Sequence, residues 1–157
     1  MPSFRTHRIV PHPPQAMFDL VADVERYPEF LPLCEELRVL SREQKADGVQ
    51  EIVAAMRVGY GPFNEQFTTR VRLEQASHRI LVSYINGPFR HLENTWNFAP
   101  HPTGCRVDFS IIYEFRSIAL GIAMGAMFDR AFRKFAEAFE ARADHVYGRP
   151  NPALNQA

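Results

Sequence analysis

Cysteine is scarce in this chain, and its two cysteines, Cys34 and Cys105, form no CxxC pair. The six histidines form neither an HxH nor an HExxH motif, so we expect no metal site. Two lone cysteines do not decide whether a disulfide forms, and reduced thiols are the default for a cytoplasmic protein.

Catalytic motifs are lacking as well. Gly59 and Gly61 lie between two predicted strands and do not lead into a helix, which argues against a loop that cradles phosphate. Nothing in the order of serine, histidine and aspartate residues indicates a nucleophilic site. We therefore expect no catalytic residues and no enzyme.

The chain also has no excess of charge of either sign and no long hydrophobic run. Its 18 basic and 18 acidic side chains give a formal net charge of zero, so no global field would draw it to DNA. A local basic patch is compatible with a net charge of zero, so this alternative stays open. The longest uncharged apolar run is too short to span a bilayer, and the N-terminus lacks a signal-peptide core. We expect a cytoplasmic protein.

What the sequence does contain is a long amphipathic stretch from Ile118 to Tyr147. Read at 3.6 residues per turn, it places charged side chains on one side and phenylalanines on the other. It holds no proline and is followed by Gly148 and Pro150, which are typical helix-stop residues. The pattern predicts one helix, roughly 45 Å long, whose first third, Ile118 to Phe128, carries no charge.

Seven segments with a period of two precede this helix. The first runs from Ser3 to Val10, and two short helices are predicted to follow it, ending in an apolar hook from Tyr27 to Pro32. Six alternating segments then run in succession to Phe115, joined by short turns, so the strands must be largely antiparallel. The predicted fold class is α+β, in the order β-α-α-β-β-β-β-β-β-α. Residues 1–148 form one domain, and we expect the tail 149–157 to be disordered.

This architecture predicts a hollow between the sheet and the helix. Seven strands span roughly 34 Å, whereas one helix with its side chains covers about 10–12 Å. A curved sheet reduces the mismatch, and an apolar space lined by aromatic side chains is a natural remainder. The alternative is a packed core, because thirteen phenylalanines could fill the same space.

Five ordered segments of the sequence carry a resemblance that covers nearly the whole chain up to Gly148. They are Val21 to Cys34, Phe67 to Val71, Gly87-Pro88-Phe89 with Leu92 and Trp96-Asn97-Phe98, Tyr113-Glu114-Phe115, and Ala138 to Ala143. Together they resemble the coenzyme Q-binding START-domain family of the polyketide cyclase-like superfamily, which also includes the ribosome-association toxins of the RatA branch.

The resemblance implies a helix-grip fold of START or Bet v 1 type, a curved antiparallel sheet around a C-terminal helix with a hydrophobic tunnel. It implies a non-catalytic protein that binds ubiquinone in support of respiration, with no required cofactor. Transient contact with a membrane surface, peripheral at the inner membrane, follows from such a ligand. The alternative is a RatA-like inhibitor of translation that binds the large ribosomal subunit. Both branches share these motifs.

The tunnel residues are expected to be apolar side chains of inward parity, with two polar side chains of the same parity to contact a head group. The apolar set is Phe30, Leu31, Val58, Phe67, Val71, Tyr84, Trp96, Phe109, Ile111, Tyr113, Met124, Met127, Phe128, Phe132 and Phe135, and the polar pair is Glu65 and Asn94. Each has a structural alternative, since a carboxylate near a strand end commonly lies in water, and a tryptophan can anchor a core.

The glycines of the uncharged helix start leave two interpretations open. Gly121 and Gly125 weaken a helix by about 1 kcal/mol each relative to alanine. They indicate either a mobile flap that opens toward a membrane, with Ile122 and Met124 turned outward in the open state, or close packing of the helix on the sheet.

Overall fold

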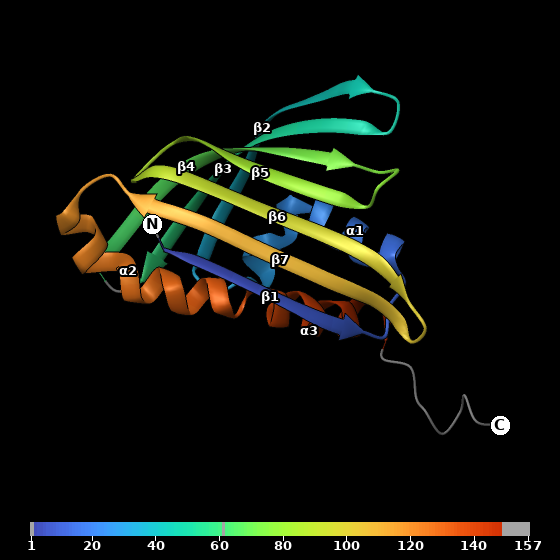
Figure 1. Cartoon of the computed structure of the whole chain (residues 1–157). Coiled ribbons are helices and arrows are strands. Elements are labelled where there is room, and N and C mark those ends of the chain that lie inside the picture. The colour runs from blue at the N-terminus through green and yellow to red at the C-terminus, as the bar shows by residue number, and fades with distance from the viewer. Residues whose placement is uncertain (1, 61, 149–157) are drawn as a thin grey trace.

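The computed structural model describes residues 2–60 and 62–148, and it shows one sheet of seven strands gripping a pair of helices (Figure 1). The elements in chain order are β1 (Ser3–Val10), α1 (Pro14–Ala22), the 3₁₀-helix η1 (Val24–Glu29), β2 (Cys34–Ala46), β3 (Val49–Tyr60), β4 (Phe63–Glu74), β5 (Arg79–Asn86), β6 (Phe89–His101), β7 (Gly104–Phe115), α2 (Ile118–Arg133) and α3 (Phe135–Tyr147). The predicted order of elements is confirmed up to the C-terminal helix. The predicted tail, 149–157, lies outside the described residues.

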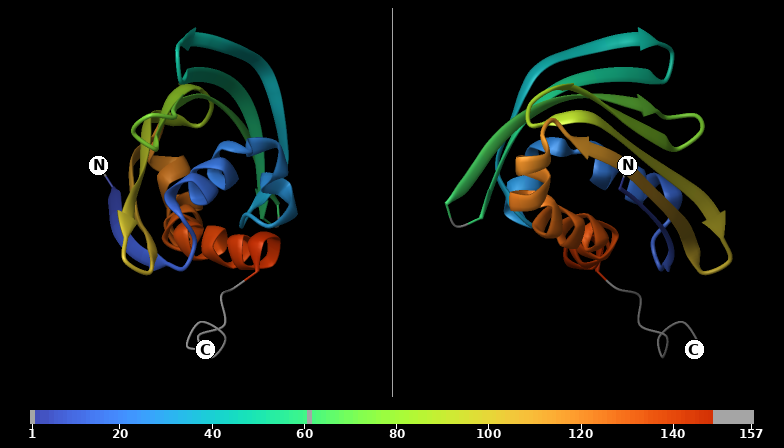
Figure 2. Two further views of the ribbon diagram at one scale, coloured as in Figure 1. Left: turned by 90° about the vertical axis from the view of Figure 1, so that its right-hand side faces the viewer. Right: turned by 60° about the vertical axis from the view of Figure 1, so that its left-hand side comes forward.

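All neighbouring strands are antiparallel, in the order β1-β7-β6-β5-β4-β3-β2. The N-terminal strand β1 pairs along its whole length with β7 and forms one edge of the sheet. At the other edge, β2 shifts its register against β3 at three places. Such bulges bend and twist a strand, and the sheet curves over the helices, as Figure 2 shows.

The concave face is apolar because alternate residues of each strand point into it. β7 shows this most clearly: Val107, Phe109, Ile111, Tyr113 and Phe115 are all buried, and the residues between them are not. This face is covered by α2 and α3, while α1 and η1 close one end (Figures 1 and 2). The antiparallel helix-grip fold is thereby confirmed.

The single C-terminal helix predicted from Ile118 to Tyr147 is wrong in one respect, because the structure breaks it at Lys134. The Lys134 N–H bonds to the carbonyl oxygen of Ala131 at 3.0 Å, a contact one residue shorter than an α-helical bond. The break turns α3 away from the line of α2, so that α2 packs on β7 while α3 packs on α1 and β1. Two shorter helices thus follow a curved sheet that one straight helix could not.

Side-chain pairs fasten α3 to the N-terminal part of the chain. The Arg8 guanidinium donates to a Glu140 carboxylate oxygen at 2.6 Å. Nε2 of the buried His12 lies 2.7 Å from an Asp144 oxygen. Because both contacts join residues about 130 positions apart, they fix α3 across the sheet edge, whereas no comparable ion pair among the described residues joins α2 to the sheet.

Alanine substitutions at two glycines should change the free energy of unfolding in opposite directions. Gly104 has φ +149°, and a Cβ there would overlap the carbonyl oxygen of Val10, so Gly104→Ala should lower the free energy of unfolding by about 2–5 kcal/mol. Gly125 is helical, and a Cβ would meet nothing within 4 Å, so Gly125→Ala should raise it by up to about 1 kcal/mol. Urea unfolding measures both. A loss of stability in Gly125→Ala would show that the helix start is packed more tightly than the open space beside Gly125 indicates.

Candidate functional site

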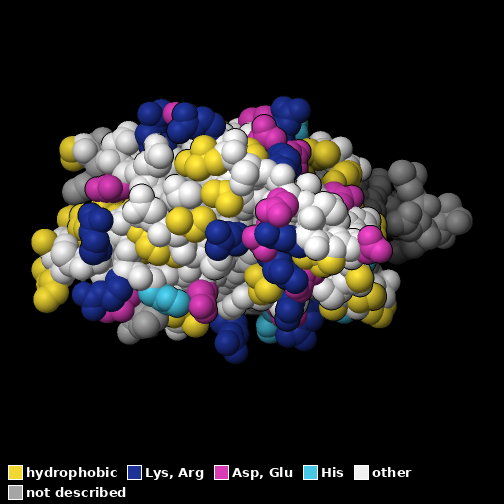
Figure 3. All heavy atoms as spheres, turned by 90° about the horizontal axis from the view of Figure 1, so that it is seen from above, with side chains coloured by type: hydrophobic (Ala, Val, Ile, Leu, Met, Phe, Trp, Pro, Cys, Tyr) yellow, Lys and Arg dark blue, Asp and Glu magenta, His cyan; other side chains and the backbone are white. Residues whose placement is uncertain are grey.

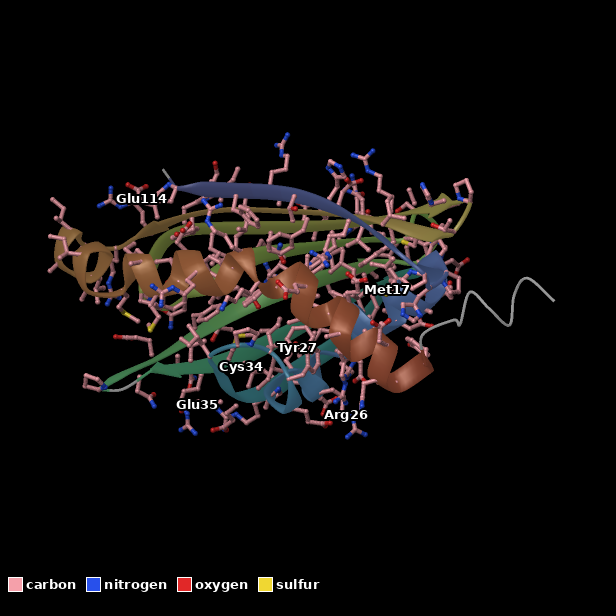
Figure 4. All side chains as sticks on the ribbon, turned by 90° about the horizontal axis from the view of Figure 1, so that it is seen from below. Met17, Arg26, Tyr27, Cys34, Glu35 and Glu114 are labelled. Carbon is pink, nitrogen blue, oxygen red and sulfur yellow. The ribbon has the colours of Figure 1, made fainter. Side chains whose placement is uncertain are left out.

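An apolar cavity of about 80 Å³ lies between the concave face of the sheet and the junction of α2 with α3. Its wall comes from every strand except β1, together with η1 and the segment that follows it. The lining residues are Val24, Tyr27, Leu31, Pro32, Leu33, Leu37, Ala54, Met56, Val58, Phe67, Thr69, Val71, Val82, Leu92, Asn94, Trp96, Ile111, Phe128, Ala131, Phe132, Phe135 and Phe139. Figure 4 views this side of the molecule, with α2 and α3 crossing the strands and the labelled Tyr27 beside them.

Ten of the seventeen residues predicted for the tunnel line this cavity. They are Leu31, Val58, Phe67, Val71, Asn94, Trp96, Ile111, Phe128, Phe132 and Phe135. The structure therefore brings most of the predicted wall together, including both halves of the C-terminal helical region. That these residues hold a ligand stays a prediction.

Seven of the predicted residues lie outside the wall of this cavity. Phe30, Glu65, Tyr84, Phe109, Tyr113, Met124 and Met127 do not line it. Period-two alternation predicted the face of the sheet correctly but not the position along it, since aromatic side chains fill both ends. Phe109 lies behind Trp96, with ring centroids 4.7 Å apart, and the Tyr84 hydroxyl accepts the Phe89 N–H at 3.1 Å. Glu65 is half-buried near the start of β4, opposite Val58.

The two predicted methionines, Met124 and Met127, differ in burial. Met124 is only 1% exposed and faces inward in this form, and the expectation that it turns outward when the helix start opens stays a prediction. Met127 is half-buried and faces a groove outside the cavity. Close packing does not account for the glycines beside them, because a Cβ at Gly121 would meet only Phe115, at 3.9 Å, and one at Gly125 would meet nothing within 4 Å.

Sequence reasoning missed the part of the wall contributed by irregular backbone. Pro32 and Leu33 connect η1 to β2, where no periodicity marks which side chains point inward. Ala54 and Thr69 share the inward parity of their strands, but parity alone does not mark a small or polar side chain as part of a cavity wall. Their small size is what leaves the space open.

Asn94 is the polar side chain best placed to meet a ligand. Its Nδ2 donates to the Ser110 carbonyl oxygen at 2.8 Å, and its Oδ1 accepts the Trp96 indole N–H at 2.9 Å. A carboxamide has two N–H donors and two acceptor lone pairs, so one of each remains for a ligand. The Tyr27 hydroxyl is committed, since it donates to the Val21 carbonyl oxygen at 2.5 Å, and burial raises its pKa.

The cavity is too small in this form for a substituted aromatic ring. A cavity of about 150 Å³ lined by aliphatic and phenylalanine side chains binds benzene, and this one has about half that volume. The sequence left two alternatives, a hollow and a core filled by phenylalanines. The structure combines them, because a small cavity remains among packed aromatic side chains. Any ligand larger than benzene must push the wall apart.

A surface groove adjoins the cavity where the wall can part. This outer groove is lined by Pro32, Leu33, Ala123, Ala126, Met127, Arg130, Ala131 and Lys134. Pro32, Leu33 and Ala131 line both the outer groove and the cavity. The two spaces are therefore adjacent along these three residues.

Over residues 2–60 and 62–148, no cluster of three or more histidine, cysteine, aspartate or glutamate side chains could hold a metal ion. In the same part of the chain, no helix is both long and apolar enough to cross a bilayer.

Known proteins similar to this chain include two that are named for different functions. The chain is 34% identical over 149 residues to the ribosome association toxin RatA of Rickettsia prowazekii, and the alignment covers 93% of this chain and 99% of that protein. It is 32% identical over 148 residues to the mitochondrial coenzyme Q-binding protein COQ10 homolog B of Xenopus laevis, covering 91% of this chain but 58% of that protein.

Solved structures agree with the fold. The solution structure of the 18 kDa protein CC1736 from Caulobacter crescentus is 35% identical, with a TM-score of 0.76 over 94% of this chain and 99% of that one. The Zhui aromatase/cyclase from a Streptomyces species has a TM-score of 0.75 at 16% identity, covering 97% of each chain, and shows the fold alone. Residues 10–140 match the family described as polyketide cyclase / dehydrase and lipid transport. With that match and the full-length relatives, the chain belongs to this family.

Proposed function

We propose that this protein is a non-catalytic binding protein for an isoprenoid quinone such as ubiquinone. The observation that carries the proposal is the apolar cavity, whose wall holds one carboxamide, Asn94, with hydrogen-bonding capacity to spare. An apolar wall favours an apolar ligand, and a single polar group can orient a quinone carbonyl. The proposal needs no cofactor.

The energetics favour a ligand with a long tail. Burial of each CH₂ contributes about 0.8 kcal/mol, so each five-carbon isoprene unit contributes roughly 4 kcal/mol. Opening an 80 Å³ cavity separates packed aromatic side chains, which opposes binding. A tail of several isoprene units outweighs that cost, whereas a bare quinone ring does not.

The ligand also sets where the protein works. An isoprenoid quinone dissolves in the bilayer, so the carrier must touch a membrane surface to exchange it. We therefore propose a cytoplasmic protein that contacts the inner membrane transiently and peripherally, in support of respiratory electron transport.

Protein purified from its native host should carry ubiquinone at near one-to-one stoichiometry. Organic extraction followed by mass spectrometry measures this directly, and uptake of a short-chain ubiquinone from detergent micelles checks it in refolded protein. Denatured protein taken through the same extraction is the control for adventitious lipid. Extracts without quinone, together with no uptake from micelles, would contradict the proposal.

A second candidate is a RatA-like inhibitor that binds the large ribosomal subunit. The observation that favours it is coverage, because the Rickettsia RatA aligns over 99% of its length whereas the Xenopus protein aligns over 58%. Charge distribution does not favour it on the face seen in Figure 3, where basic and acidic side chains alternate. Arginines of the sheet are also paired, as Arg70 and Arg72 of β4 are with Glu51 of β3. Salt-sensitive co-sedimentation with large subunits would support this candidate.

A further inference from the structure

Leu33 lines both the outer groove and the cavity and has an unusual backbone conformation. This residue has φ +67°, a left-handed conformation that non-glycine residues rarely adopt. Its backbone is fastened, because its carbonyl oxygen accepts the Gly59 N–H at 3.1 Å. Its side chain stands between the outer groove and the cavity. Strained residues persist where the surroundings hold them, and they concentrate at ligand clamps and switches.

The opposite side of the outer groove is formed by a helix suited to move. Ala123 and Ala126 give it a floor of small side chains. The helix start has two glycines that packing does not require, Gly121 and Gly125. Among the described residues, no ion pair fastens α2 to the sheet, in contrast to α3. Movement of α2 away from Leu33 therefore breaks no ion pair to the sheet, and the charged contact that α2 does make with β1 is that of the Arg133 guanidinium over the Phe4 ring, 4.7 Å from its centroid.

The exposed face of α2 is apolar at one end and cationic at the other. Ile118 and Ile122 lie one turn apart and are 85% and 81% exposed. Farther along the same helix, Arg130 borders the outer groove, and Lys134 follows at the break. Arg133 between them is neutralised by Asp129 at 2.9 Å, whereas no described acidic side chain forms an ion pair with Arg130 or Lys134.

We infer that the outer groove is the mouth of the cavity and is gated by Leu33, and that the exposed face of α2 docks this mouth on an anionic lipid bilayer. The inference rests on the proposed function for the identity of the ligand only. Exposed isoleucines enter the interface between headgroups and acyl chains, and nearby cations meet lipid phosphates. The complementary charge selects an anionic bilayer over a neutral one, and the ligand passes between Leu33 and Ala131 without crossing water.

Docking is tested with vesicles and requires no quinone. The protein should co-sediment with phosphatidylcholine vesicles that contain about one-third phosphatidylglycerol, and weakly with phosphatidylcholine alone. Each lost cation weakens partitioning about fivefold, so Arg130→Glu with Lys134→Glu should weaken it at least about 25-fold. The matched control is Arg5→Glu with Arg38→Glu, which makes the same charge change at two exposed residues of β1 and β2. Equal losses in both variants, or equal binding to neutral vesicles, would overturn the docking surface.

The gate is tested with the two native thiols. Cys34 follows Leu33 and lies opposite the cavity-lining Val58, whereas Cys105 lies opposite Val10 of β1. Burial raises the pKa of each thiol to about 11. Both should therefore react slowly with a thiolate-selective reagent at pH 8. Leu33→Gly should speed the labelling of Cys34 at least about tenfold and leave Cys105 unchanged. The control is His78→Gly, because His78 also has positive φ but lines neither space.

Two results separate the gate from simple unfolding and from the quinone proposal. If both thiols of Leu33→Gly label together, the variant has lost its fold. Ala126→Trp, which fills the outer groove from an exposed position, then decides the matter by slowing Cys34 labelling in folded protein. Unchanged Cys34 labelling in both variants would overturn the gate. Gated labelling and vesicle docking without quinone uptake would instead refute the quinone as ligand and leave the mouth in place.

Discussion

Ala54→Leu should prevent quinone uptake without unfolding the protein. Ala54 is 2% exposed and lines the cavity from β3. Leucine adds three carbon atoms, which fit the available 80 Å³. If they pack well, burial of the added groups should raise the free energy of unfolding by up to about 2 kcal/mol. Quinone affinity should fall at least about 100-fold, because the ligand would have to displace a packed side chain.

The matched control for this substitution is Val53→Leu, one residue earlier in β3. Val53 lies on the opposite face of the sheet and does not line the cavity, so quinone affinity should stay unchanged. Titration with a short-chain ubiquinone, followed by quenching of Trp96 fluorescence, measures both variants. Unchanged affinity in Ala54→Leu would show that the ligand lies elsewhere. Equal loss in both variants would show that the effect is not local.

The strands could be predicted because one physical rule governs them. A sheet with one buried face forces period-two alternation, and Val107 to Phe115 follow it without exception. The break at Lys134 could not be predicted in this way. No proline or glycine lies between Phe128 and Tyr147, so the local sequence favours a continuous helix. Tertiary packing against a curved sheet introduces the break.

The site could be predicted only in part, for a related reason. Parity predicts on which face of the sheet a side chain lies. It does not predict whether the side chain lines the cavity, because that depends on which aromatic rings fill the two ends of the concave face. Tyr113 has the same parity as Ile111 yet packs against Phe132, with ring centroids 5.0 Å apart, outside the cavity. Leu33 lies in a connection without periodicity, so the sequence pattern does not indicate which way its side chain points. Its role depends on a backbone angle and on two neighbouring spaces, which only coordinates supply.

Phe128→Ala should have the largest effect on stability, and ligand should restore part of the loss. Phe128 is 2% exposed and contacts three other aromatic rings, Phe89, Phe115 and Phe132, at centroid distances of 5.5 to 5.6 Å. Truncation of so enclosed a ring should lower the free energy of unfolding by about 3–5 kcal/mol. Because Phe128 also lines the cavity, the lost ring enlarges a space that a quinone ring could then occupy.

The comparison with Phe135→Ala shows whether that enlargement matters. Phe135 lines the same cavity but is half-buried and contacts two rings, Phe109 and Phe132, so its truncation should cost less. Urea unfolding with and without a short-chain ubiquinone measures both effects. A ligand present at 100 times its dissociation constant adds about 2.7 kcal/mol to the folded state, and this gain should appear in Phe128→Ala at lower ligand concentration than in the parent, because the space is already open. If ligand stabilises neither variant, the enlarged cavity does not accept a quinone, and the aromatic wall is a structural core.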